Sequence, residues 1–207
     1  AAEGVIASKE WVIDVLGRLV DHSLVSVRDQ GEGTRLELLS VVREFAAEKL
    51  SEFDGLQQET ELRHLNWYAA HGGTAETRAR RIIGEDGAEL NAERRNIAVA
   101  LHRSMALGLE RESRLLCLAE MDITRQLGPL NGGIRLAKRV LSSGNTSCES
   151  RNRLQLALGE LQFRVGRLDE AEANFQHLVT SPCGAGLRAF CHLSRKRMEE
   201  GNPSGAH

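Results

Sequence analysis

Asp21, His22 and Ser23 are three consecutive side chains of the types that build a serine nucleophile, its base and its orienting acid. A triad needs these groups to converge in space, and adjacent residues do not converge, so the run does not predict hydrolysis. We expect His22 instead at the carboxyl end of a helix, where the helix dipole favours a cation. No Gly-x-Ser-x-Gly, His-Glu-x-x-His or dinucleotide-binding glycine motif occurs in the sequence. The sequence therefore predicts a protein that is not an enzyme.

Residues of zinc-binding type gather toward the carboxyl end: His177, Cys183, Cys191 and His192. Cys191 and His192 are adjacent, and adjacent side chains on a helix point about 100° apart, which disfavours joint ligation. The four cysteines of the chain fall at irregular distances without a Cys-x-x-Cys pair. We therefore expect reduced thiols and neither a metal nor another cofactor.

Arginines cluster at residues 78–81 (RARR) and at Arg94 and Arg95, and arginine binds phosphate well. Acidic residues alternate with them, at positions 76, 85, 86, 89 and 93, which is typical of ion-paired and solvated helix faces. The net charge of −2 provides no overall attraction to nucleic acid. DNA is therefore the alternative partner and not the favoured one.

The composition of the 207 residues favours helices, because aromatic residues make up only 4% and aliphatic and small residues dominate. The length fits two packed units. No apolar run approaches the ~18 residues of a membrane span, and the amino terminus lacks the pattern of a secretion signal. We expect a cytoplasmic protein without a membrane partner.

Two helices and a hairpin are predicted in the first 55 residues. Apolar residues at helical spacing predict a helix over residues 9–21. Residues 24–27 and 35–39 flank a polar, glycine-bearing stretch and predict a β-hairpin with a longer loop. Ser40 is expected to cap a second helix. The predicted inward stripe of that helix consists of Val41, Val42, Phe45, Ala46, Lys49 and Leu50.

An internal repeat marks the second half of the chain. Three glycines are each followed five residues later by a small residue, in the pairs Gly128 and Gly133, Gly166 and Ala171, and Gly201 and Ala206. The best copy also contains Leu158, Gly159 and Phe175, where small residues let two antiparallel helices approach and Phe175 fills the space beneath them. This copy resembles a tetratricopeptide repeat. The first copy is degenerate and has Met121 in place of Gly159.

The other predicted helices cover residues 56–71, 75–83, 88–107, 111–127, 133–143, 151–165 and 169–181. In the first of them Leu62, Leu65, Tyr68 and Ala69 are expected to face inward. The glycines at 72 and 73 predict a break and a joint between subdomains. Residues 128–133 are expected to separate the two helices of the first repeat. Asp169 with Glu172 predicts a capped helix start.

Three segments carry a family resemblance: residues 16–25 (LGRLVDHSLV), 38–50 (LLSVVREFAAEKL) and 88–101 (AELNAERRNIAVAL). The first two resemble the winged-helix segment of bacterial STAND-type (NB-ARC-like) signal-transduction ATPases, a group that includes transcriptional regulators. The third is similar to the helix with which the repeat region of that family begins. The resemblance implies a neighbouring P-loop ATPase domain, a winged helix and a helical repeat array in a longer chain.

The nucleotide site of that family is not found in this sequence. No Gly-x-x-x-x-Gly-Lys-Ser/Thr phosphate loop occurs, so the chain is not expected to be an ATPase itself. Leu38, Leu39 and Ser40 occupy the positions of the Met-His-Asp trio with which some relatives sense nucleotide, so that role does not transfer. We expect the chain to be a fragment of a longer protein.

These observations predict a mainly α fold in which a winged-helix remnant with a small β-hairpin is followed by a tetratricopeptide-like array. The expected domains are residues 1–55 (winged-helix remnant), 56–110 (helical linker and first helices of the repeat region) and 111–207 (repeats, the third truncated). The expected function is that of a non-catalytic regulatory fragment whose repeats bind a protein or a small effector. The alternative is a DNA-binding winged-helix regulator that dimerises through the repeats. Because the first helices of such repeats line the partner-binding face, Asn152, Gln155 and Gln162 are the predicted contacts.

Overall fold

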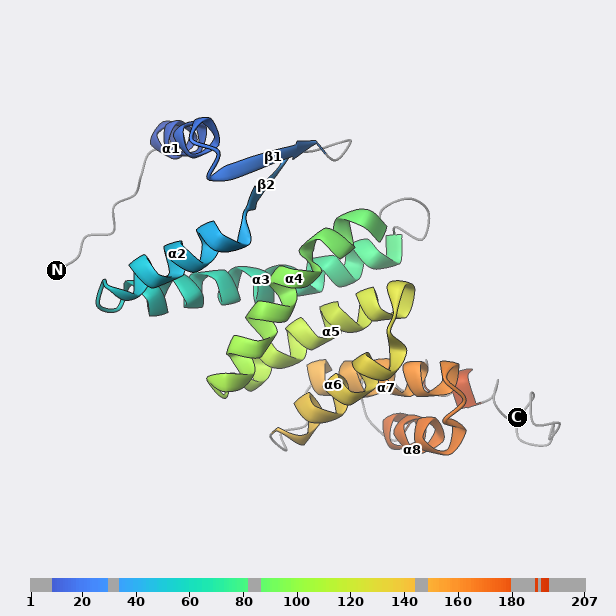
Figure 1. Ribbon diagram of the computed structural model, residues 1–207. Coiled ribbons are helices and arrows are strands. Elements are labelled where there is room, and N and C mark those ends of the chain that lie inside the picture. The colour runs from blue at the N-terminus through green and yellow to red at the C-terminus, as the bar shows by residue number, and fades with distance from the viewer. Residues whose placement is uncertain are drawn as a thin grey trace. The chain divides into compact units, whose positions relative to one another are not determined.

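The computed structural model describes residues 9–29, 34–81, 87–143, 149–179, 189 and 191–193. The chain divides into two compact units, Ala1–Thr60 and Glu61–His207. The fold is mainly helical with one small antiparallel hairpin, as predicted (Figure 1). The predicted segment 111–207 belongs to one unit with residues 61–110 of the predicted segment 56–110, and residues 56–60 belong to the first unit.

The first unit consists of α1 (Lys9–Asp21), β1 (Val25–Asp29), β2 (Thr34–Leu38) and α2 (Ser40–Ser51). The strands pair with Val25 opposite Leu38 and Val27 opposite Leu36, so these four apolar side chains share one face of the hairpin. The turn after α1 is closed by bonds from the Ser23 amide to the Val20 carbonyl (2.8 Å) and from the Leu24 amide to the Leu19 carbonyl (2.9 Å). The predicted helix and hairpin are confirmed, the strand bounds to within two residues.

Helix α2 differs from the prediction in two respects, its first residue and the burial of its apolar stripe. Ser40 is its first residue, so Leu39 is at the capping position and makes no side-chain capping bond. The predicted inward stripe is not buried: Val41 is 76% exposed and Phe45 59% exposed. The reason is the small number of elements in this unit. Within residues 11–28 and 34–60 Val25 alone is a buried hydrophobic residue.

Helix α3 (Leu56–Arg81) runs without interruption through Gly72 and Gly73, so the predicted break is wrong. A glycine costs about 1 kcal/mol in a helix interior, but unlike proline it keeps its backbone donor. Strong helix formers on both sides, among them Ala69 and Ala75, continue the helix across the pair. The predicted inward residues are correct, since Leu65 and Ala69 are buried and Leu62 and Tyr68 half-buried.

The second unit continues with α4 (Gly87–Ala106), α5 (Glu110–Leu127), α6 (Leu130–Ser142), α7 (Glu149–Arg164) and α8 (Leu168–Val179). Gly108, with φ of 67°, ends α4 as predicted. Helix α6 begins three residues earlier than predicted, because Gly128 and Pro129 alone form the turn and Gly132 and Gly133 are helical. Asp169 lies in the first turn of α8 and not at its cap.

The helix pairs α5–α6 and α7–α8 pack consecutively and form a helical array (Figure 1). A Cβ added to Gly159 would lie 2.5 Å from a ring atom of Phe175, which confirms the predicted close approach beneath that aromatic ring. A Cβ at Gly133 would lie 2.7 Å from Thr124 and 3.3 Å from the Met121 methyl group. In the first pair Met121 thus lies against a glycine.

The array extends beyond α8 at its carboxyl end. Ala189 and Leu193 are buried in one cluster with Leu156, Phe175 and Leu178. The predicted residues Gly201 and Ala206 of the third copy lie outside the described residues. None of the helices, over the residues described, combines the length and the apolar character that crossing a membrane requires.

Candidate functional site

The three predicted contact residues lie along one side of α7. Asn152 is 4% exposed, Gln162 is 1% exposed and Gln155 is half-buried. Gly159 belongs to the same row of helical spacing, and it packs against Phe175 of α8. This side of α7 therefore turns toward α8, the second helix of its own pair.

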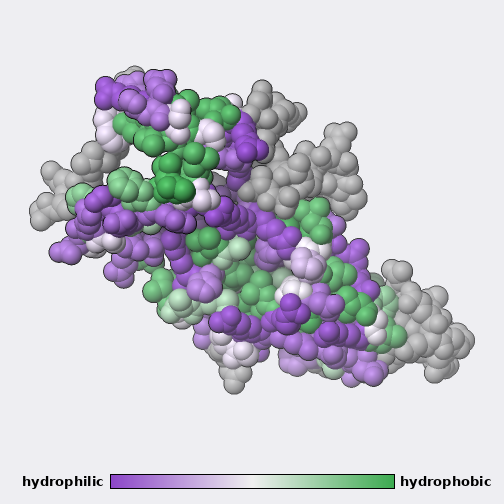
Figure 2. Space-filling view, in the orientation of Figure 1, coloured by the Kyte–Doolittle hydropathy of each residue, from purple (hydrophilic) through white to green (hydrophobic). Residues whose placement is uncertain are grey.

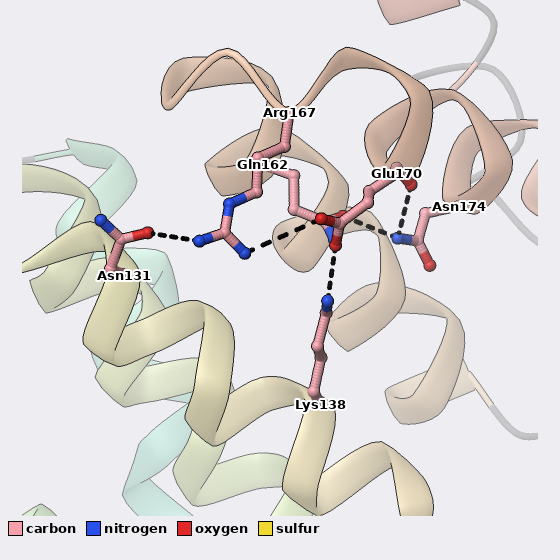
Figure 3. Close-up of polar contacts among 6 residues, drawn as sticks. All are labelled: Asn131, Lys138, Gln162, Arg167, Glu170 and Asn174. Atoms are coloured by element: carbon pink, nitrogen blue, oxygen red, sulfur yellow. Dashed lines mark hydrogen bonds and ion pairs between the residues drawn. The ribbon is translucent and has the colours of Figure 1, made fainter.

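Gln162 is held in a polar network between α7 and α8 (Figure 3). Its amide nitrogen donates to Oε2 of Glu170 (2.7 Å), and its amide oxygen accepts from Nδ2 of Asn174 (2.7 Å). A buried amide with both ends bonded stabilises the pair of helices. Partner contact by Asn152, Gln155 and Gln162 stays a prediction, and Gln162 has a structural role in addition.

Glu170 is the centre of this network and extends it to α6. Lys138 of α6 donates to the same Oε2 (2.5 Å), and Arg167 lies 3.8 Å from Oε1 and donates to Asn131 (3.0 Å). The Lys138 hydrogen bond is the largest cause that holds the pKa of Glu170 below its ordinary value, and the Gln162 bond acts in the same direction. The network thus joins three helices of two successive pairs.

A second polar cluster lies between the first helices of successive pairs. We call it the first-helix face, and it consists of Asp122, Arg125, Glu160, Arg164 and His192.

Arg125 of α5 is the link in the first-helix face: its Nη2 lies 2.7 Å from Oε2 of Glu160 on α7. Its Nη1 lies 3.6 Å from Oδ1 of Asp122, one turn earlier on α5. Nε2 of His192 lies 3.2 Å from the other oxygen of Glu160, and Arg164 donates to the backbone carbonyl of Arg125 (2.6 Å). These polar contacts run from α5 over α7 to the helical residues 191–193.

The position of the two acids follows from the repeat. Asp122 and Glu160 each come directly after the matched residues Met121 and Gly159, 38 residues apart (159 − 121 = 38). Because Gly159 contacts α8, the next residue on the helix points about 100° away, toward the neighbouring first helix. Neither acid is among the predicted site residues. The 38-residue offset, applied to charged positions as well as to small ones, is the signal that could have found them.

The arginines proposed to contact phosphate differ in their surroundings. Arg94 is not free, because it is paired with Glu120 of α5 (2.7 Å). Arg95 is exposed. The side chains of residues 78–81 lie outside the described residues. The acid that pairs with Arg94 is thus a buried residue of another helix and not one of the alternating acids at positions 76, 85, 86, 89 and 93.

The other candidate groups are arranged as follows. Asp21, His22 and Ser23 are exposed at the end of α1. Cys183 lies outside the described part of the chain, within which no three His, Cys, Asp or Glu side chains are grouped as metal ligands. Cys117 is buried in the core, where desolvation and the charge of Glu120 raise the pKa of its thiol. A thiol that stays protonated is a poor nucleophile.

Comparisons with known proteins found nothing similar: no family model, no curated protein and no solved structure matches the chain. The relation to STAND-type regulators therefore rests on residues 16–25, 38–50 and 88–101 and stays a proposal. The geometry of the first-helix face is independent of that relation.

Proposed function

We propose that this chain is a non-catalytic regulatory segment whose helical repeats bind a protein or a small effector through the first-helix face. The observation that carries the proposal is the run of polar contacts from Asp122 and Arg125 of α5 over Glu160 of α7 to His192. A stacked array offers the same side of each first helix to a partner. Asp122 and Glu160 are buried, so a partner on this face would contact the half-buried Arg125 and His192 and the exposed Arg164. Side chains already held in place lose less entropy on binding.

The resemblance to STAND-type regulators supports a role inside a larger signalling protein. In this proposal the α1–β1–β2–α2 unit is the winged-helix remnant, the helix pairs are tetratricopeptide-like repeats, and the ATPase domain lies elsewhere in a longer cytoplasmic chain. Binding at the repeats would be coupled to that domain. The paired carboxylates Glu120, Glu160 and Glu170, each with a basic partner at 2.5 to 2.7 Å, support a structural rather than a chemical use of acids here.

An affinity capture with matched variants tests the proposal. The bait is the whole chain, and Arg164→Glu reverses an exposed charge on the first-helix face. Arg135→Glu reverses an exposed charge on α6, a second helix, and is the control. A protein from the source cells that wild type and Arg135→Glu retain, and Arg164→Glu loses at an unchanged melting temperature, supports the proposal. Retention by all three baits, or the same loss with both variants, contradicts it.

The DNA-binding alternative has one observation in its favour. Arg28 and Arg35 are paired opposite each other on the hairpin, where a wing can contact a phosphate backbone. Arg28, however, is bound to Glu37 (2.8 Å), which lowers the positive charge of that face. We expect no binding of a labelled mixed-sequence duplex in a fluorescence anisotropy titration at low salt. Tight binding that falls steeply at ~0.2 M salt would establish the alternative instead.

A further inference from the structure

Arg94 of α4 contacts three groups around the carboxyl end of α5. Its Nε and Nη2 both donate to Oε1 of Glu120, at 2.9 and 2.7 Å. Its Nη1 donates to the carbonyl oxygen of Gly128 (2.8 Å), and Thr124 lies 3.4 Å from Nη2. One guanidinium thus connects α4 to the side of α5 and to the residue that follows α5.

Glu120 is a charged residue at a position where the second pair is apolar. The 38-residue offset matches Glu120 with Leu158, which is 3% exposed in the core, and Glu120 itself is 7% exposed. Desolvation raises the pKa of Glu120, and the contacts with Arg94 oppose that rise. A buried carboxylate without a cation costs several kcal/mol, whereas a leucine would cost nothing of this kind. A contribution to stability alone therefore does not explain why the chain has the Arg94–Glu120 ion pair at this position.

The position of the Gly128 carbonyl oxygen explains why residue 94 is an arginine. Gly128 caps α5 with φ of 69°, and α6 begins two residues later. The amides of Gly132 and Gly133, in the first turn of α6, both donate to the Pro129 carbonyl, at 3.0 and 3.3 Å. Arg94 therefore holds the carbonyl next to the turn from which α6 starts.

We propose that Arg94 is a positioning residue, a latch that fixes the α5–α6 turn to α4 so that α4 and the first helix pair move as one body. Glu120 keeps the guanidinium in the orientation in which Nη1 reaches Gly128. The guanidinium group has planar donors that point in fixed directions, so it can bond to Glu120 and to the Gly128 carbonyl at once. A lysine ammonium cannot bond to both of these acceptors in the same geometry. The latch does not depend on the partner-binding proposal.

Two single variants separate the latch from ordinary ion pairing. Arg94→Met removes the contacts with Glu120, Thr124 and Gly128 and leaves Glu120 buried without its cation, and we expect a fall in melting temperature of roughly 6 to 20 °C. Arg94→Lys keeps the charge, and we expect it to recover most of the melting temperature. It should still show at least tenfold faster amide exchange at Gly132 and Gly133, because the Gly128 carbonyl is released. Arg95→Met, at the exposed neighbouring position, is the control and should change neither quantity.

A double variant tests positioning against stability. Arg94→Met combined with Glu120→Leu replaces the pair by apolar groups, as in the second helix pair, and should restore the melting temperature to within about 2 °C of wild type. The fast exchange at Gly132 and Gly133 should persist in this stable protein. Wild-type exchange in the double variant or in Arg94→Lys would overturn the proposal. An unchanged melting temperature in Arg94→Met would overturn it as well.

Discussion

At the scale of single residues, the two helix pairs differ in which helix carries the larger side chain at the matched positions. Gly159 makes room for Phe175 in the second pair. The 38-residue offset places Met121 and Ala137 at the matching positions of the first pair, and both are fully buried there. The larger residue of the matched positions thus lies on the second helix of one pair and on the first helix of the other, and all of these positions are buried.

This exchange predicts a compensating pair of mutations. Phe175→Ala should lower the free energy of unfolding by roughly 3 to 5 kcal/mol because it leaves a cavity. Gly159→Met should lower it by about 1 to 3 kcal/mol because it overfills the space against Phe175. The double variant reproduces the first pair, and urea unfolding should show a loss at least ~1 kcal/mol smaller than the sum of the two. Strict additivity would show that the two helix pairs are not packed alike.

Glu170 predicts a pH dependence of stability. Because its pKa is lowered in the fold, its contribution is present above the ordinary value of 4.5 and is lost as the pH falls through the folded value. We expect Glu170→Gln to be less stable than wild type at neutral pH, with the difference vanishing in acid.

Urea titrations between pH 7 and pH 3 measure this effect. The raised pKa of Glu120 acts in the opposite direction, since its contribution is lost as the pH rises, so Glu120 must stay in place in both proteins. A difference between wild type and Glu170→Gln that does not change with pH would mean that Glu170 does not carry the acid dependence.

At the scale of the elements, periodicity predicted most helices correctly and failed where local and tertiary effects compete. The pattern of α2 contains an apolar stripe, but within residues 11–28 and 34–60 nothing is placed to bury Phe45. The pattern of α3 contains a glycine pair, which weakens a helix without breaking it. The start of α6 was misplaced because Gly133 serves helix packing and not the turn. A glycine in a turn and a glycine that permits close helix packing are the same residue type, so the sequence alone does not distinguish the two roles.

The difference in burial between Phe45 and Phe175 gives a prediction for the elements that carry them. Phe45 is 59% exposed and Phe175 is 1% exposed. Phe45→Ala should therefore change the free energy of unfolding by less than about 1 kcal/mol, a small part of the roughly 3 to 5 kcal/mol expected for Phe175→Ala. Thermal melts followed by circular dichroism compare the two. A loss at Phe45 as large as that at Phe175 would show that α2 is covered in solution.

At the scale of the whole molecule, the sequence predicted a mainly α chain with a hairpin and a helical array, and these are confirmed. The predicted contacts Asn152, Gln155 and Gln162 lie on the side of α7 that turns toward α8, and partner contact by them stays a prediction. The charged groups of the first-helix face were missed because an acid at position 122 or 160 has no apparent partner until Arg125 and His192 are folded beside it. Contacts between distant segments determine which polar residues are brought together.

The central claim is that a partner binds the first-helix face. The most direct measurement is the dissociation constant of the captured partner for wild type, Arg164→Glu and Arg135→Glu, determined by isothermal titration calorimetry. We expect an affinity at least tenfold weaker for Arg164→Glu, about 1.4 kcal/mol, and within twofold of wild type for Arg135→Glu. Equal affinities for all three proteins, or a larger loss with Arg135→Glu, would contradict it.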